Sequence, residues 1–80
     1  MKLLVFVAED SAADSTVDAL VEQGFRVTRL ASTGGFLRRG NTTLLVGLEE
    51  AAVERVIAIA RRTAPRALVI ALDLERYEQI

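Results

Sequence analysis

The chain contains no cysteine and no histidine among its 80 residues. Without cysteine there are no disulfides, thiolate nucleophiles or thiolate metal ligands, and without histidine there is no Ser-His or Cys-His pair. A transition-metal site would have to use carboxylates alone, which favour harder ions. Catalysis by the usual side chains is therefore disfavoured, and we expect a protein that is not an enzyme, with no catalytic residue, no metal and no cofactor.

Long apolar runs are also missing. The run LLVFVA after Lys2 leads directly into Glu9 and Asp10, and it is shorter than the apolar part of a signal peptide. No run approaches the roughly 20 residues that cross a bilayer. We expect a cytoplasmic protein with no membrane partner. A chain of this length buries only about 60 to 65% of its unfolded surface, so we expect one domain that oligomerisation would stabilise.

Acidic residues are absent from the middle of the chain. The net charge is only −1, which argues against a nucleic acid polymer as a partner. Between Gln23 and Leu48 there is no Asp or Glu, whereas this window holds four arginines: Arg26, Arg29, Arg38 and Arg39. A cationic window in an otherwise acidic chain predicts a small anionic ligand.

The hydrophobic pattern predicts four strands and two helices. Strands are expected at residues 2–8, 25–30, 42–48 and 67–72. The first helix is expected to have Asp10 or Ser11 as its cap and Gly24 at its end, and the second to run from about residue 49 to 62. The order βαββαβ is typical of an α+β ferredoxin-like sandwich, with both helices on one face of an antiparallel sheet.

Both sides of the first predicted strand are apolar. Leu3, Val5 and Val7 alternate with a second apolar set on the other side. Two helices on one face of the sheet cover only one of these sets. The other needs a cover, most simply copies of the same chain, so the sequence predicts a closed oligomer.

Residues 35–42 read GFLRRGNT, which resembles a phosphate-binding P-loop. The required lysine is replaced by Asn41, and a strand follows where a helix should begin, so a P-loop NTPase is excluded. Gly34 and Gly35 still permit backbone amides to approach an anion, and Phe36 can stack on a base. Each feature alone also fits a plain turn or a core anchor.

The longer run GFRVTRLASTGGFLRRGNTTLLVG, residues 24–47, is more specific. It resembles the signature of the PII-like cyclic di-AMP receptor family, small bacterial signalling proteins in which such a run opens the T-loop. The start MKLLVFV and the close ALDLERYEQI are also similar to that family. The resemblance implies a single PII-like domain over residues 1–80 and a homotrimer with ligand sites in the clefts between subunits.

The same resemblance implies the ligand and the residues that bind it. Cyclic di-AMP would bind at eight positions: Arg26, Thr28, Gly35, Phe36, Leu37, Asn41, Gly47 and Gln79. The protein would act as a non-enzymatic sensor, in which the bound dinucleotide orders the T-loop and changes the affinity for an effector protein.

The chain departs from the family at one place. The family usually has a long loop, the B-loop, between its second helix and last strand, whereas here Arg62 and Pro65 lead almost directly into RALVIAL. Two alternatives therefore stay open, namely binding of another adenine nucleotide and a structural or protein-binding trimer without a dinucleotide ligand. An acylphosphatase-like enzyme is disfavoured, since Ala8, Glu9 and Asp10 stand where a phosphate-binding arginine is needed.

Overall fold

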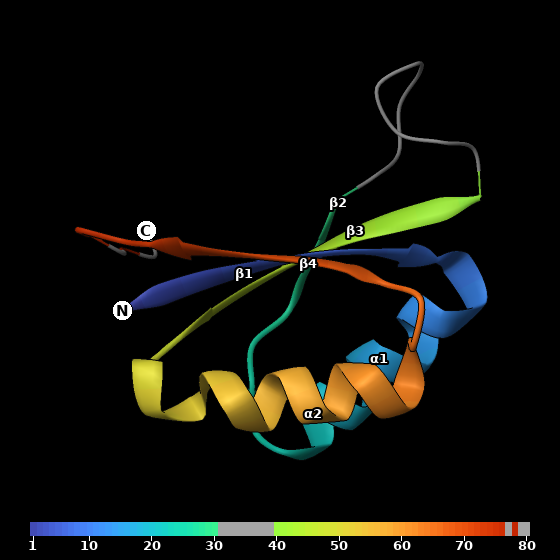
Figure 1. The fold of residues 1–80 in the computed structure, drawn as a ribbon, viewed down its shortest axis with the longest axis horizontal. Coiled ribbons are helices and arrows are strands. Elements are labelled where there is room, and N and C mark those ends of the chain that lie inside the picture. The colour runs from blue at the N-terminus through green and yellow to red at the C-terminus, as the bar shows by residue number, and fades with distance from the viewer. Residues whose placement is uncertain (31–39, 77, 79–80) are drawn as a thin grey trace.

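The fold is a four-stranded sheet with two helices on one face (Figure 1). The structure, a computed structural model, describes residues 1–30, 40–76 and 78. Its elements are β1 (Lys2–Glu9), α1 (Asp10–Glu22), β2 (Thr28–Leu30), β3 (Asn41–Leu48), the 3₁₀ turn η2 (Glu50–Ala52), α2 (Val53–Thr63) and β4 (Leu68–Asp73). The strand order is β2-β3-β1-β4, with every neighbouring pair antiparallel. The predicted α+β ferredoxin-like sandwich is confirmed.

Strand β1 is the centre of the sheet, as its apolar sequence predicts. It pairs with β3 from Lys2 opposite Leu48 to Glu9 opposite Asn41, and with β4 on its other edge. Leu4 and Phe6 are almost completely buried beneath the helices, whereas Val5 between them is only half-buried. Within one chain, β1 is thus fully buried on one face, because the helices cover only that face.

The core lies between this face and the helices. From α1 it receives Ala13 and Leu20, and from α2 it receives Val56 and Ala60, all nearly inaccessible to solvent. Burying a side chain the size of leucine or valine contributes about 1.5 to 3 kcal/mol. Helix α2 therefore packs on the sheet through a buried face that also includes Ile59.

The sequence predicts the C-terminal end of α1 correctly but not its N-terminal cap. Gly24 has a φ of +89°, and the amide of Phe25 donates to the carbonyl of Leu20 at 3.0 Å. This left-handed helix end is the one that the glycine predicts. The predicted cap at the start is wrong, since α1 begins at Asp10 after Glu9, with no side-chain cap hydrogen bond. The Asp10 carboxylate instead accepts a hydrogen bond from Thr42.

Strand β2 is shorter than the sequence predicts. It covers only Thr28–Leu30, because residues 25–27 leave the end of α1 without pairing with β3. Residues 25–27 nevertheless alternate in exposure: Phe25 and Val27 are half-buried, whereas Arg26 is exposed. The Arg55 guanidinium lies 5.0 Å from the centre of the Phe25 ring, within the range of a cation–π contact.

Candidate functional site

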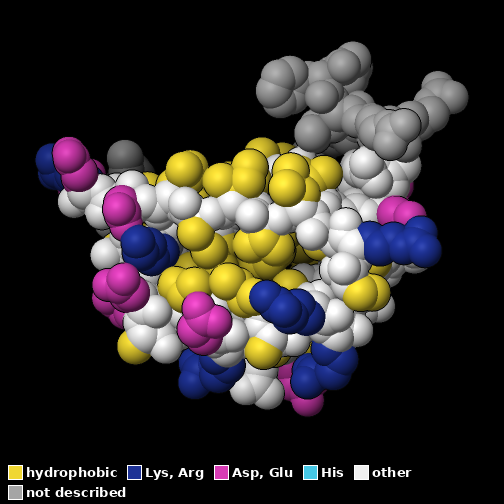
Figure 2. Space-filling model, in the orientation of Figure 1, with side chains coloured by type: hydrophobic (Ala, Val, Ile, Leu, Met, Phe, Trp, Pro, Cys, Tyr) yellow, Lys and Arg dark blue, Asp and Glu magenta, His cyan; other side chains and the backbone are white. Residues whose placement is uncertain are grey.

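The face of the sheet that the helices leave open is apolar. Leu68, Ile70 and Leu72 of β4 pair with Val7, Val5 and Leu3 of β1, so the six side chains share this face. The three from β4 are 57%, 43% and 47% exposed. Figure 2 shows apolar side chains gathered along this side of the sheet, with charged side chains around the helices. We call this surface the open face.

Two of the predicted ligand residues meet at one end of the sheet. Arg26 and Gly47 line a hollow of about 410 Å³, which we call the Arg26 hollow. Gly47 lies opposite Leu3 on β1 and so faces the open side, where its lack of a side chain leaves the strand backbone accessible. The remaining lining residues are Met1, Gly24, Phe25, Leu48, Glu49 and Ala52. An arginine beside accessible backbone suits an anionic ligand that also carries hydrogen-bonding groups.

The two described arginines of the cationic window differ in their contacts. Arg29 lies opposite the buried Leu44, and its guanidinium donates to Asp14 of α1 at 2.6 Å. Arg26 is exposed, and among residues 1–30, 40–76 and 78 it forms no ion pair. The charge of Arg29 is therefore used within the fold, whereas that of Arg26 is available to a ligand.

Thr28 and Asn41 also belong to the open face, but at different distances from the Arg26 hollow. Thr28 pairs with Leu45, which lies two residues before Gly47 on β3 and on the same face of the sheet. Asn41 is at the other end of β3, about 20 Å from Gly47 at 3.3 Å per residue. Within one chain, the structure therefore brings Arg26, Thr28 and Gly47 together and leaves Asn41 apart from them.

The start of β3 is held firmly to α1. The amide of Asp10 donates to the carbonyl of Gly40 at 2.8 Å, and Thr42 Oγ1 donates to Asp10 Oδ1 at 2.6 Å. Gly40 has a φ of +91°, a conformation that favours glycine. Asn41 lies between these two anchored residues, so its backbone position is well defined.

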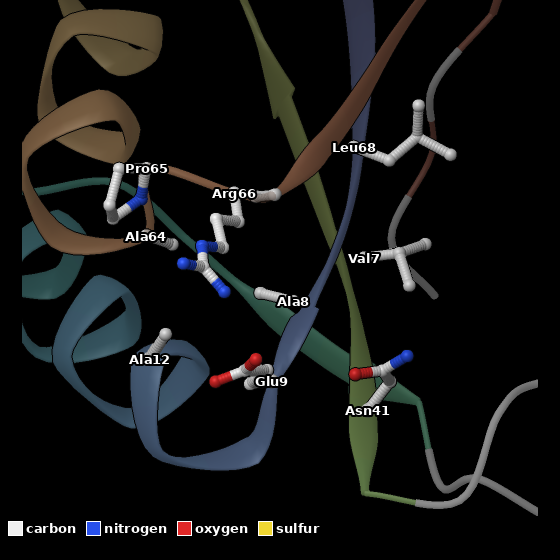
Figure 3. A pocket seen from close by; sticks show the side chains of 10 residues that line it. Val7, Ala8, Glu9, Ala12, Asn41, Ala64, Pro65, Arg66 and Leu68 are labelled. Atoms are coloured by element: carbon white, nitrogen blue, oxygen red, sulfur yellow. The ribbon is translucent and has the colours of Figure 1, made fainter.

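Asn41 lines a second hollow of about 480 Å³, formed where β1 ends and β4 begins (Figure 3). We call it the Arg66 hollow. Its polar lining residues are Glu9, Asn41 and Arg66, and its apolar ones are Val7, Ala8, Ala12, Ala64, Pro65, Ala67 and Leu68. Neither Glu9 nor Arg66 belongs to a binding motif that the sequence predicts. The one available signal was the Pro-Arg pair in the short connection before the last strand.

The other predicted ligand residues, Gly35, Phe36, Leu37 and Gln79, lie outside the described residues, as do Gly34, Arg38 and Arg39. Their binding roles stay predictions. Within the described ranges no cluster of three or more carboxylates that could hold a metal ion is found. None of the described helices is long and apolar enough to cross a membrane.

The sheet order and its one-sided helix layer define an α+β protein of the PII-like, ferredoxin-like type. A crystal structure of a functionally unknown protein from Pediococcus pentosaceus is similar, with a TM-score of 0.85 and 29% identity over 99% of this chain and 96% of that one. A DUF3240 family protein from Shewanella baltica shares the fold, with a TM-score of 0.74 and 15% identity over 99% of this chain and 94% of its own. The family model described as cyclic-di-AMP receptor matches residues 1–79, and the chain belongs to this family.

Proposed function

We propose that this protein is a non-enzymatic receptor that binds cyclic di-AMP. Membership of the cyclic-di-AMP receptor family supports a binding role and this ligand. The placement of Arg26 supports it further, since this exposed arginine lines a hollow with Gly47 and has no ion-pair partner in the described part of the chain. A guanidinium pairs well with the phosphate oxygens of a dinucleotide.

The ligand site is proposed to lie in the cleft between subunits of a homotrimer. Two observations support this arrangement. The open face carries three aliphatic side chains of β4 that are each more than 40% exposed, which is a surface suited to contact with further copies. Asn41 and Gly47 lie at opposite ends of β3, so a cleft between neighbouring chains lets both ends contribute to one ligand.

Binding is proposed to act on an effector protein through residues 31–40, the segment that joins β2 to β3. Thr28 and Asn41 lie close to either end of this segment, and both are among the proposed ligand contacts. A ligand held at both positions stabilises one arrangement of the connection between them, and this changes the affinity of the segment for a partner. Cyclic di-AMP thereby controls the partner without any reaction.

The observation that carries this proposal is the contrast between Arg26 and Arg29, and the experiment uses it directly. Isothermal titration with cyclic di-AMP is carried out on the wild type, Arg26→Ala and Arg29→Ala. Each variant loses one positive charge, and the two positions are only three residues apart in the sequence. Only Arg26 lines the hollow, whereas Arg29 is paired with Asp14. We expect Arg26→Ala to weaken binding by at least about tenfold, the usual loss for a hydrogen bond to a charged group. Equal weakening in both variants would show that only net charge matters.

A further inference from the structure

The short connection between α2 and β4 is a tight turn that presents Arg66. The amide of Ala67 donates to the carbonyl of Ala64 at 3.0 Å, which makes residues 64–67 a four-residue turn. Pro65 occupies its second position, where the fixed φ of proline is favourable. Ala64 is only 4% exposed and its amide donates to the carbonyl of Ala60, so the turn is anchored to α2. The backbone of Arg66 is therefore held in place at the rim of the Arg66 hollow.

Arg66 faces a carboxylate across this hollow. Figure 3 shows the guanidinium of Arg66 and the carboxylate of Glu9 pointing toward one another, with Ala12 and Ala64 beside them. No ion pair joins the two side chains within the described part of the chain. The Arg66 guanidinium only donates hydrogen bonds, and the Glu9 carboxylate only accepts them. A third group can therefore bind between them.

The chemistry of these two side chains selects a particular partner. A ligand between them needs an acceptor for Arg66 and a donor for Glu9 on one edge, and a flat apolar body for the walls of alanine and proline. On the edge that carries N7, an adenine base has both: N7 accepts, and the 6-amino group next to it donates. On this same edge guanine has a carbonyl oxygen in place of the amino group and no donor, and that oxygen would be repelled by Glu9.

We propose that Glu9 and Arg66 recognise the edge of one adenine of the dinucleotide and set its preference over bases with a carbonyl at the same position. This inference rests on the proposed function, since it assigns two further contacts to the same ligand. Asn41 links the Arg66 hollow to the proposed ligand site, because it lines this hollow and is also one of the proposed ligand residues. The volume of about 480 Å³ lies within the range of small-molecule sites.

The test measures base preference rather than affinity alone. Dissociation constants are determined for cyclic di-AMP and for its hypoxanthine analogue, in which a carbonyl replaces each amino group. The proteins are the wild type, Glu9→Gln and Arg66→Gln, with Glu22→Gln and Arg62→Gln as controls. The two control residues are exposed, carry the same charges and do not line the hollow. The ratio of the two constants is insensitive to a general loss of stability.

The wild type is expected to bind cyclic di-AMP more tightly than the analogue. In Glu9→Gln the preference should fall by about tenfold, because the new amide can donate to a carbonyl as well as accept from an amino group. Arg66→Gln should bind cyclic di-AMP about tenfold more weakly, whereas the two controls should behave as the wild type.

Two results would overturn the inference, and they are distinguishable. If the wild type binds cyclic di-AMP and Arg26→Ala does not, but Glu9→Gln keeps the full base preference, the proposed function stands and the role of Glu9 and Arg66 is wrong. If the wild type binds neither dinucleotide, the proposed function fails and this inference fails with it.

Discussion

Thr42 Oγ1 donates a hydrogen bond of 2.6 Å to Asp10 Oδ1 and so joins the start of β3 to the first residue of α1. The neighbouring Thr43 provides a natural comparison. Its hydroxyl oxygen is buried and has no hydrogen-bond partner in the part of the chain that the structure describes. Two adjacent threonines of one strand therefore differ in whether the hydroxyl group stabilises the fold.

Thr42→Val is expected to lower the free energy of unfolding by about 1 kcal/mol, because it removes this hydrogen bond and keeps the branched shape of the side chain. Thr43→Val is expected to be neutral or slightly stabilising, since an unpaired buried hydroxyl is costly. Urea unfolding of the two variants measures the difference. Equal destabilisation by both changes would contradict the assigned role of the Thr42 hydroxyl.

A second pair of hydroxyl groups joins the two helices. Thr16 Oγ1 and Thr63 Oγ1 lie 2.7 Å apart, and each also lies within 3.0 Å of the carbonyl oxygen four residues earlier in its own helix. Because each hydroxyl has one hydrogen, one threonine donates to the other, which in turn donates to its own helix carbonyl. Changing either threonine to valine is expected to cost about 1 kcal/mol in unfolding free energy. The double change should cost less than the sum of the two, as measured in a double-mutant cycle with denaturant. Strict additivity would show that the two hydroxyl groups do not interact.

The open face gives a direct prediction about assembly. Ile70→Lys places a charge in the middle of this face, where Ile70 is 43% exposed, and is expected to convert the proposed homotrimer into monomers. Val21→Lys is the matched control, because Val21 is 56% exposed but lies on α1. Sedimentation velocity at micromolar concentration distinguishes the two. A wild type that sediments as a monomer would contradict the trimer at once.

The strand ends of β1 and β4 carry an exposed ion pair between Lys2 and Asp73. The hydrogen bond from Lys2 lowers the pKa of Asp73, and the same bond raises the pKa of Lys2. A carboxylate with a lowered pKa stabilises the fold above its unfolded pKa, and this contribution is lost as the pH falls through the folded pKa. For the lysine, whose pKa is raised, the contribution is present below the unfolded pKa and is lost as the pH rises through the folded one.

Lys2→Met is therefore expected to raise the pKa of the Asp73 carboxyl toward its ordinary value. An NMR titration of the Asp73 side-chain carbon measures this shift, and Lys2→Arg, which keeps the charge, should largely preserve the lowered pKa. Stability at neutral pH should change little, because exposed ion pairs contribute little. An unchanged pKa in Lys2→Met would show that the two groups do not interact in solution.

Local signals in the sequence predicted the parts of the fold that depend on local structure. The helix end at Gly24 follows from a single glycine. The place of β1 inside the sheet follows from its unbroken apolar run. The predicted cap of α1 is wrong because the carboxylate of Asp10 accepts a hydrogen bond from β3, which is distant in sequence. The length of β2 also depends on its pairing with another strand, which periodicity does not reveal.

The candidate site shows the same limit. The family resemblance predicts Arg26 and Gly47 as ligand residues, and in the structure both line the Arg26 hollow. The Arg66 hollow could not be predicted, since Glu9, Asn41 and Arg66 come from three separate parts of the chain and meet only after the sheet is formed. No single segment contains a pattern that marks such a meeting point.

Cyclic di-AMP is the proposed ligand, and a titration of the wild-type protein by calorimetry is the decisive measurement. Cyclic di-AMP, ATP and cyclic di-GMP are compared under the same conditions. We expect saturable binding of cyclic di-AMP near one molecule per subunit, with much weaker binding of the other two. Tighter binding of ATP would indicate a different adenine nucleotide as the ligand, and the absence of heat with cyclic di-AMP would show that the protein does not bind this dinucleotide.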